Sequence, residues 1–146
     1  AVTRIHSAAG LHDGYGAMFD RPFRAPHHTT SPSGMLGTWT QPGEITLAHH
    51  GILYLDHAHQ LHPDVLDELH AASRAGTMRV QQGHRARTMP AGALLIAAVP
   101  PCPCGQGESA YSCASRDHGA FEQHLHRLEN RFDVTIRLPA YRHREA

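Results

Sequence analysis

The segment that most constrains the fold is Gly51-Ile52-Leu53-Tyr54-Leu55-Asp56, an unbroken apolar run that ends in a carboxylate. A run this short and this apolar, opened by a glycine, predicts a strand that is buried on both faces of a parallel sheet. Open α/β sheets bind their ligands at the carboxyl ends of their strands. We therefore expect an α/β domain in which Asp56 stands at the ligand-binding edge.

The clearest helix is predicted to begin at Pro63 and to end at Gly76, a residue suited to a helix C-terminus. Two predicted strands, 51–56 and 93–99, are apolar on both sides, so we expect helices on both faces of a three-layer αβα sheet. The other predicted elements are a weak helix over 2–11, an extended piece over 22–30, a loop over 31–43, a helical turn over 44–49, a hairpin over 77–89, a helix over 117–129 and a strand over 132–138.

Composition indicates one soluble domain, with 40% hydrophobic and 18% charged residues among 146. The sequence predicts no membrane span and no signal segment. The 13 basic and 13 acidic side chains balance, so net charge alone does not indicate a nucleic-acid partner. Three cysteines, an odd number, fit a reducing cytosol, and we expect a cytoplasmic protein. Fifteen histidines make the charge unusually dependent on pH.

The strand before Asp56 has the form of a Walker B strand, whose aspartate holds the Mg²⁺ of a bound nucleotide. ATPases of this type usually carry a glutamate at the next position, where it orients the attacking water. This chain has His57 there. Histidine titrates near neutral pH and is chemically able to act as a base, but its ring does not replace a flexible carboxylate.

Several contiguous motifs resemble the Mg-chelatase-like AAA+ ATPases, and within them the bacterial competence-type branch, whose members act on DNA. The resemblance covers residues 2–139. Its motifs are Arg21-Pro22-Phe23-Arg24-Ala25-Pro26-His27-His28, Pro42-Gly43-Glu44-Ile45, Leu47-Ala48-His49-His50-Gly51 and Cys102-Pro103-Cys104-Gly105.

The resemblance implies a parallel αβα sandwich that assembles into rings and binds Mg-ATP between neighbouring subunits. By the same resemblance, Asp56 matches the Walker B aspartate and Arg131 the arginine finger offered to the next subunit. The hairpin over 77–89 matches a hairpin that faces the centre of the ring.

The chain departs from the family pattern at catalytic positions. It contains no G-x-x-x-x-G-K-[ST] phosphate loop, His57 replaces the glutamate, and Pro100 replaces the sensor asparagine. We also expect no helical lid after the last strand of these residues. We therefore expect residues 1–146 to form a single partial AAA+ core without a lid, a degenerate member that does not hydrolyse ATP alone and does not bind Mg-ATP unaided.

A zinc-binding or partner-binding module is the alternative function. Its ligands would be three thiols and one imidazole, a set that Zn²⁺ binds as a tetrahedron. Against zinc, the C-P-C motif places two ligands closer than the usual spacing. The candidate ligands are Cys102, Cys104, Cys113 and His118.

Two further possibilities concern partners. In the first, the chain contributes structure or Arg131 to a ring, which it forms by self-association or with an intact AAA+ relative. In the second, the chain is part of a longer active enzyme. Three arginines of the hairpin, Arg79, Arg85 and Arg87, would contact DNA phosphates or would only aid solubility. The His27-His28 and His49-His50 pairs are expected to be structural, hydrogen-bonding to buried backbone groups.

Overall fold

The computed structural model describes residues 1–12, 16–100 and 118–138 of the chain. The chain divides into two compact units, Ala1–Ala98 and Val99–Ala146. The helices are α1 (Val2–Ala8), α2 (Pro32–Leu36), α3 (Glu44–Leu47), the 3₁₀ turn η1 (Ala58–Gln60), α4 (Pro63–Ala75) and α5 (His118–Glu129). The strands are β1 (Phe23–Arg24), β2 (Ile52–Leu55), β3 (Thr77–Gln82), β4 (Arg85–Pro90) and β5 (Leu94–Ala97). No helix of the described ranges has the length and apolar character required to cross a bilayer.

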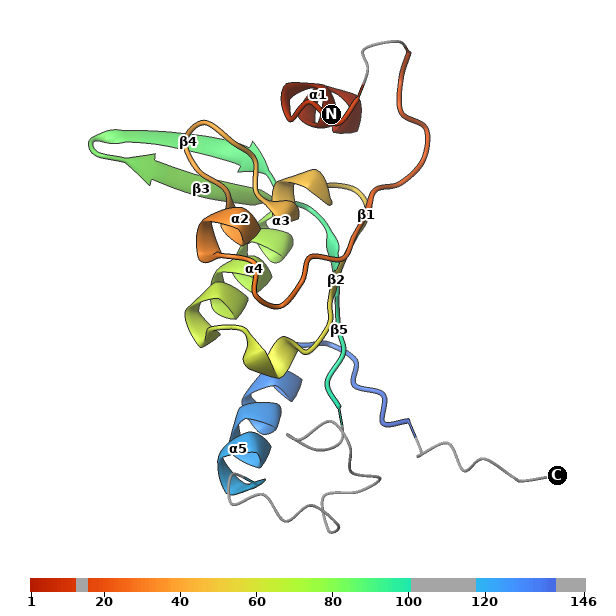
Figure 1. Ribbon diagram of the computed structural model, residues 1–146, viewed down its shortest axis with the longest axis vertical. Helices are drawn as coiled ribbons and strands as arrows, with labels where there is room; N and C mark the ends of the chain where they lie inside the picture. Colours follow the sequence, from red (N-terminus) through yellow and green to blue (C-terminus); the bar gives the residue numbers. More distant parts are fainter. Residues whose placement is uncertain (13–15, 101–117, 139–146) are drawn as a thin grey trace, which may run out of the picture. The chain divides into compact units, whose positions relative to one another are not determined.

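The central element of the first unit is β2, which pairs in parallel with β1 on one side and with β5 on the other (Figure 1). The register places Phe23, Ile52 and Leu94 in one row and Tyr54 beside Ile96 in another. Strands β3 and β4 form a separate antiparallel hairpin. The predicted α/β class, with a mostly parallel sheet and a hairpin insertion, is confirmed.

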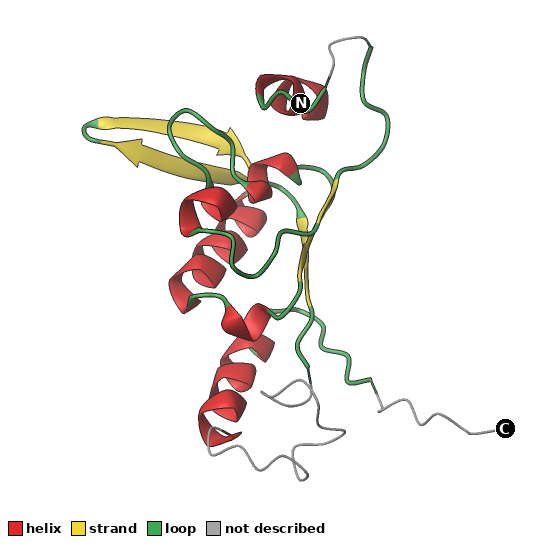
Figure 2. Cartoon of the chain, in the orientation of Figure 1, coloured by secondary structure: helices red, strands yellow, loops and turns green. Residues whose placement is uncertain are grey.

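Only one face of this sheet is covered by helices within the first unit. Leu53 and Leu55 are 0% and 1% exposed, and α2, α3 and α4 lie along that side (Figure 2). On the other face Leu94 and Ile96 are 61% and 39% exposed. The expectation of helices on both faces is therefore not met in this unit. An apolar run shows that both faces of a strand are able to be buried, but it does not show what covers them.

The longest helix, α4, begins and ends as the sequence predicts. Pro63 occupies its first turn, and the imidazole of His62 accepts a hydrogen bond from the Asp64 N–H at the N-cap. Gly76 ends it in the left-handed region at φ 71°. The apolar face of α4 is buried, and the helix contacts α2, α3, β3 and β5. Its buried residues are Val65, Leu66, Leu69 and Ala72.

Two segments differ from the prediction. Residues 32–36, predicted as loop, form α2, because Ser31 caps the Gly34 N–H and Pro32 suits a first turn. Residues 132–138, predicted as a strand, form none, and Val134 and Ile136 are 74% and 76% exposed. Alternation predicts a strand-like segment, whereas a strand requires a neighbouring backbone with which to pair.

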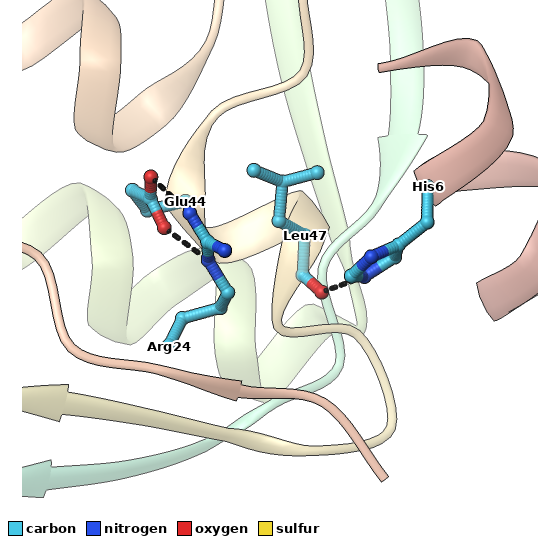
Figure 3. A network of polar contacts seen from close by, with 4 residues as sticks. All are labelled: His6, Arg24, Glu44 and Leu47. Atoms are coloured by element: carbon cyan, nitrogen blue, oxygen red, sulfur yellow. Dashed lines mark hydrogen bonds and ion pairs between the residues drawn. The ribbon is translucent and has the colours of Figure 1, made fainter. Parts of the chain in front are cut away.

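Polar contacts join α3 to both β1 and α1 (Figure 3). Arg24 donates two hydrogen bonds to the Glu44 carboxylate, from Nε to Oε2 at 2.6 Å and from Nη2 to Oε1 at 2.8 Å. The hydrogen bond to Glu44 raises the pKa of the Arg24 guanidinium. Buried His6 donates from Nε2 to the Leu47 carbonyl at 2.9 Å. These contacts fix α3 between the N-terminal helix and the first strand.

Replacing Arg24 by Met should lower the free energy of unfolding by about 1–2 kcal/mol, because the Glu44 carboxylate loses both donors. The loss should be smaller than for a fully buried pair, since the two side chains are 31% and 18% exposed. Urea unfolding measures it. The matched variant Arg79→Met, on the exposed hairpin, should change stability by less than about 0.5 kcal/mol. Equal effects of both variants would mean that the ion pair contributes nothing.

Leu53→Ala should cost about 2–5 kcal/mol, because it leaves a cavity on the covered face of β2. Ile96→Ala, on the uncovered face, should cost less than about 1 kcal/mol, because little buried contact is lost. Urea unfolding of both variants tests the difference. Similar costs would show that the second face is buried in solution.

Candidate functional site

Asp56 lies one residue beyond the end of β2, at the carboxyl edge of the parallel sheet. Backbone hydrogen bonds join the segments that follow β2 and β5 at this edge. The Ala98 N–H donates to the Leu55 carbonyl at 2.9 Å, and the Ala58 N–H donates to the Ala98 carbonyl at 3.0 Å. The carboxylate is therefore presented next to the end of β5, where open α/β sheets bind ligands.

The Asp56 side chain takes part in the turn that follows the strand. Its Oδ1 accepts a hydrogen bond from the His57 N–H at 2.9 Å, and His57 has left-handed backbone at φ 50°. The Asp56 side chain is exposed. A carboxylate offers about four lone-pair sites, so this one bond leaves acceptor capacity for a cation.

A row of four imidazoles runs beside Asp56, from the segment after β1 to the turn after β2. Ring centroids are 4.1 Å apart for His27 and His28, 5.7 Å for His28 and His57, and 5.7 Å for His57 and His59. The sequence patterns did not lead us to predict that His28 and His57 lie close together. The parallel order of the strands would have indicated it, because residues that follow neighbouring parallel strands meet at one edge of the sheet.

His57 is packed into this row rather than directed at solvent. Its Nδ1 is buried and has no hydrogen-bond partner in the part of the chain that the structure describes. In those same ranges no three histidine, cysteine, aspartate or glutamate side chains are placed to hold a metal ion. The row is therefore a packed cluster of rings beside a single carboxylate.

The remaining predicted site residues belong to the second unit. Arg131 follows α5, and its Nη1 donates to the Arg127 carbonyl at 2.9 Å, near the C-terminal end of that helix. Pro100 follows the strand β5 in the chain and has no N–H to donate. The three thiols of the zinc hypothesis lie outside the described residues, and His118 begins α5. Their metal-binding role stays a prediction, as does the finger role of Arg131.

The hairpin β3–β4 forms a cationic arm that extends from the helices of the first unit (Figure 1). Residues 77–90 carry three arginines and no acidic side chain. The register places Arg85 and Arg87 on the same face as the buried Met78 and Met89, and Arg79 on the opposite face. Positive charge therefore lies on both faces of the arm. Arg87 also donates from Nη1 to the Trp39 carbonyl at 3.0 Å.

The structural role predicted for the second histidine pair is confirmed for His49. This residue is 8% exposed, and its Nδ1 accepts a hydrogen bond from the Gly92 N–H at 3.1 Å. Its ring lies 3.8 Å from that of His50. Burial lowers the pKa of His49, and the charges of His50 and of the N-terminal amino group lower it further.

Comparison with known proteins matches residues 1–146 to the family described as magnesium chelatase, subunit ChlI. The competence protein ComM of Haemophilus influenzae is 34% identical over 125 residues, which are 82% of this chain and 24% of ComM. The uncharacterized protein YifB of Salmonella typhimurium is 34% identical over the same shares. A Mycobacterium tuberculosis protein is 34% identical over 111 residues, 73% of this chain and 22% of its own length. The chain thus spans about a quarter of the length of these relatives.

Proposed function

This chain belongs to the magnesium chelatase subunit ChlI family, in its competence-type branch, and we propose that it supplies part of the nucleotide site of an AAA+ ATPase that acts on DNA. The observation that carries the proposal is the position of Asp56. Strand β2 delivers this carboxylate to the sheet edge beside the end of β5, with His57 directly after it.

Asp56 is the residue that would hold the Mg²⁺ of a bound nucleotide. The side chain fits this role, because Mg²⁺ prefers oxygen ligands and keeps its remaining positions for water and phosphate oxygens. The bound cation would neutralise charge on the phosphates. Residues 1–146 contain no G-x-x-x-x-G-K-[ST], so the proposed site takes its phosphate-binding N–H groups and lysine from another source.

His57 supports the further proposal that this chain does not hydrolyse ATP by itself. The glutamate of an active site is a mobile carboxylate that orients water. At this position the chain has an imidazole whose Nδ1 is buried and whose ring contacts those of His28 and His59. A ring held in this way is not free to follow an attacking water.

Arg131 gives the chain a way to act in a ring made with copies of itself or with an intact relative. An arginine finger stabilises the charge that develops on a neighbour's ATP and accelerates hydrolysis strongly. In this structure the Arg131 guanidinium donates from Nη1 to the Arg127 carbonyl at 2.9 Å, near the end of α5.

Adding the chain to an intact competence-type relative should raise the relative's rate of ATP hydrolysis at least tenfold, because fingers contribute about 10³–10⁵ in other systems. Steady-state phosphate release measures the rate. Arg131→Ala should abolish the stimulation, whereas Arg79→Ala should still stimulate.

Calorimetry of the chain alone with Mg-ATP should give no binding heat. Asp56→Asn, which keeps the acceptor for the His57 N–H, serves as its control. Binding that is lost in Asp56→Asn would mean that the chain carries its own phosphate contacts.

Failure of the chain to form a complex with the intact relative would refute the proposed role in a ring.

DNA contact is proposed for the hairpin β3–β4, whose Arg79, Arg85 and Arg87 are all exposed. Replacing all three by Gln should weaken binding to single-stranded DNA at least tenfold at low salt. It should also reduce the slope of log affinity against log salt by about 2, since three phosphate contacts contribute about 0.7 each. The control Arg21→Gln removes an exposed arginine outside the hairpin. Equal affinities for both variants would exclude the hairpin as the contact.

A further inference from the structure

Three residues, Ala91, Gly92 and Ala93, connect the hairpin to β5, and hydrogen bonds hold each of them. The N–H of Ala91 donates to the Gly76 carbonyl at 2.9 Å. The hydroxyl of Ser73 donates to the Ala93 carbonyl at 2.5 Å. These two bonds attach the ends of the connection to the C-terminal end of α4. The orientation of the hairpin relative to the sheet therefore depends on this short connection.

The middle residue, Gly92, is held on both sides of its backbone by consecutive histidines. Its N–H donates to Nδ1 of His49 at 3.1 Å, and its carbonyl accepts from the backbone N–H of His50 at 2.7 Å. A Cβ at position 92 would lie 3.6 Å from the His49 ring. The connection is thus fastened to the segment that leads directly into β2.

The bond from His49 exists in one protonation state only. An imidazole nitrogen accepts a hydrogen bond when it carries no proton, so neutral His49 must hold its proton on Nε2. A proton added to Nδ1 forms a new N–H bond there, removes the acceptor lone pair and sets two donors against each other. The bond to Gly92 then breaks, and the part-buried N–H of Gly92 loses its partner.

Other titratable groups act on this imidazole from its own segment and from α1. The ring of His50 lies tilted against it, with centroids 3.8 Å apart, and the amino group of Ala1 adds positive charge. His6, also on α1, donates to the Leu47 carbonyl two residues before His49. Because the native state resists protonation of His49, the unfolded state binds more protons as the pH falls below about 6.5. The stabilisation from neutral His49 is complete above that pH and is lost below it.

We propose that the bond between His49 and Gly92 is an acid-released latch that fixes the cationic hairpin to the parallel sheet. At neutral pH the latch holds the connection, and the arginines keep one orientation relative to β2. Protonation of Nδ1 releases the Gly92 N–H and loosens residues 91–93, while the hydrogen bonds of Ala91, of Ala93 and of the Gly92 carbonyl remain. The latch rests on these contacts alone. Only its consequence for DNA binding by the hairpin rests on the proposed function.

Amide hydrogen exchange of Gly92, measured by NMR and corrected for intrinsic rates, tests the latch. Its protection in the wild-type chain should fall severalfold between pH 7.5 and pH 4.5, mostly below about pH 6.5. The ¹⁵N shift of His49 Nδ1 should move to the protonated position within the same range, at a lower pH than for an exposed histidine. Unchanged protection while His49 titrates would overturn the proposal.

Two variants separate the latch from general acid unfolding. His49→Asn offers a side-chain oxygen near the position of Nδ1 that accepts the bond and does not titrate, so Gly92 protection should persist at both pH values. His84→Asn, at the exposed end of the hairpin, should behave as wild type. Loss of protection in His49→Asn at low pH would show that another group controls Gly92. Because no DNA is present, these results are independent of the arginine test above.

Discussion

Strand β2 is the element on which the rest of the first unit depends, because among the strands that the structure describes it is the one that pairs on both sides. Its parallel partners β1 and β5 define a common carboxyl edge, and that edge determines where Asp56 stands. Its covered face carries Leu53 and Leu55, and burying a leucine side chain contributes about 1.5–3 kcal/mol. Backbone pairing thus involves all four residues of β2, and apolar burial involves Leu53 and Leu55 among them.

Polar contacts then position the elements around this strand. The bidentate pair of Arg24 and Glu44 joins β1 to α3, and His6 joins α1 to the end of α3. His49 and His50, immediately before β2, hold the connection between the hairpin and β5. Residues of the motifs that resemble an ATPase signature therefore position the helices and strands of this chain. Their presence is explained by the contacts that they make in the folded chain.

The site at the carboxyl edge combines a retained residue with a changed one. Asp56 is exposed and keeps acceptor capacity, whereas His57 is packed among other imidazoles. Phosphoryl transfer depends on positioned charge, so a change of one positioning group affects turnover more than it affects folding. This explains how the fold of the family is compatible with a histidine at position 57.

The sequence by itself determined the class of the fold and the local ends of its elements. Apolar runs, Pro63 and Gly76 predict β2, β5 and α4, because periodicity, caps and turn residues act over a few neighbours. It also predicted that Asp56 stands at a strand end. These features need no information from distant residues.

Only the tertiary structure decided which surfaces and side chains meet. Four features depend on segments that are far apart in the chain. Two are surfaces without a partner: the uncovered face with Leu94 and Ile96, and the segment 132–138, which forms no strand. The other two are contacts: the row of rings that joins His28 to His57, and the bond between His49 and Gly92. The physical reason is that burial and hydrogen bonding are properties of pairs. A residue pattern specifies what a side chain is able to contact, and only the folded chain determines the partner.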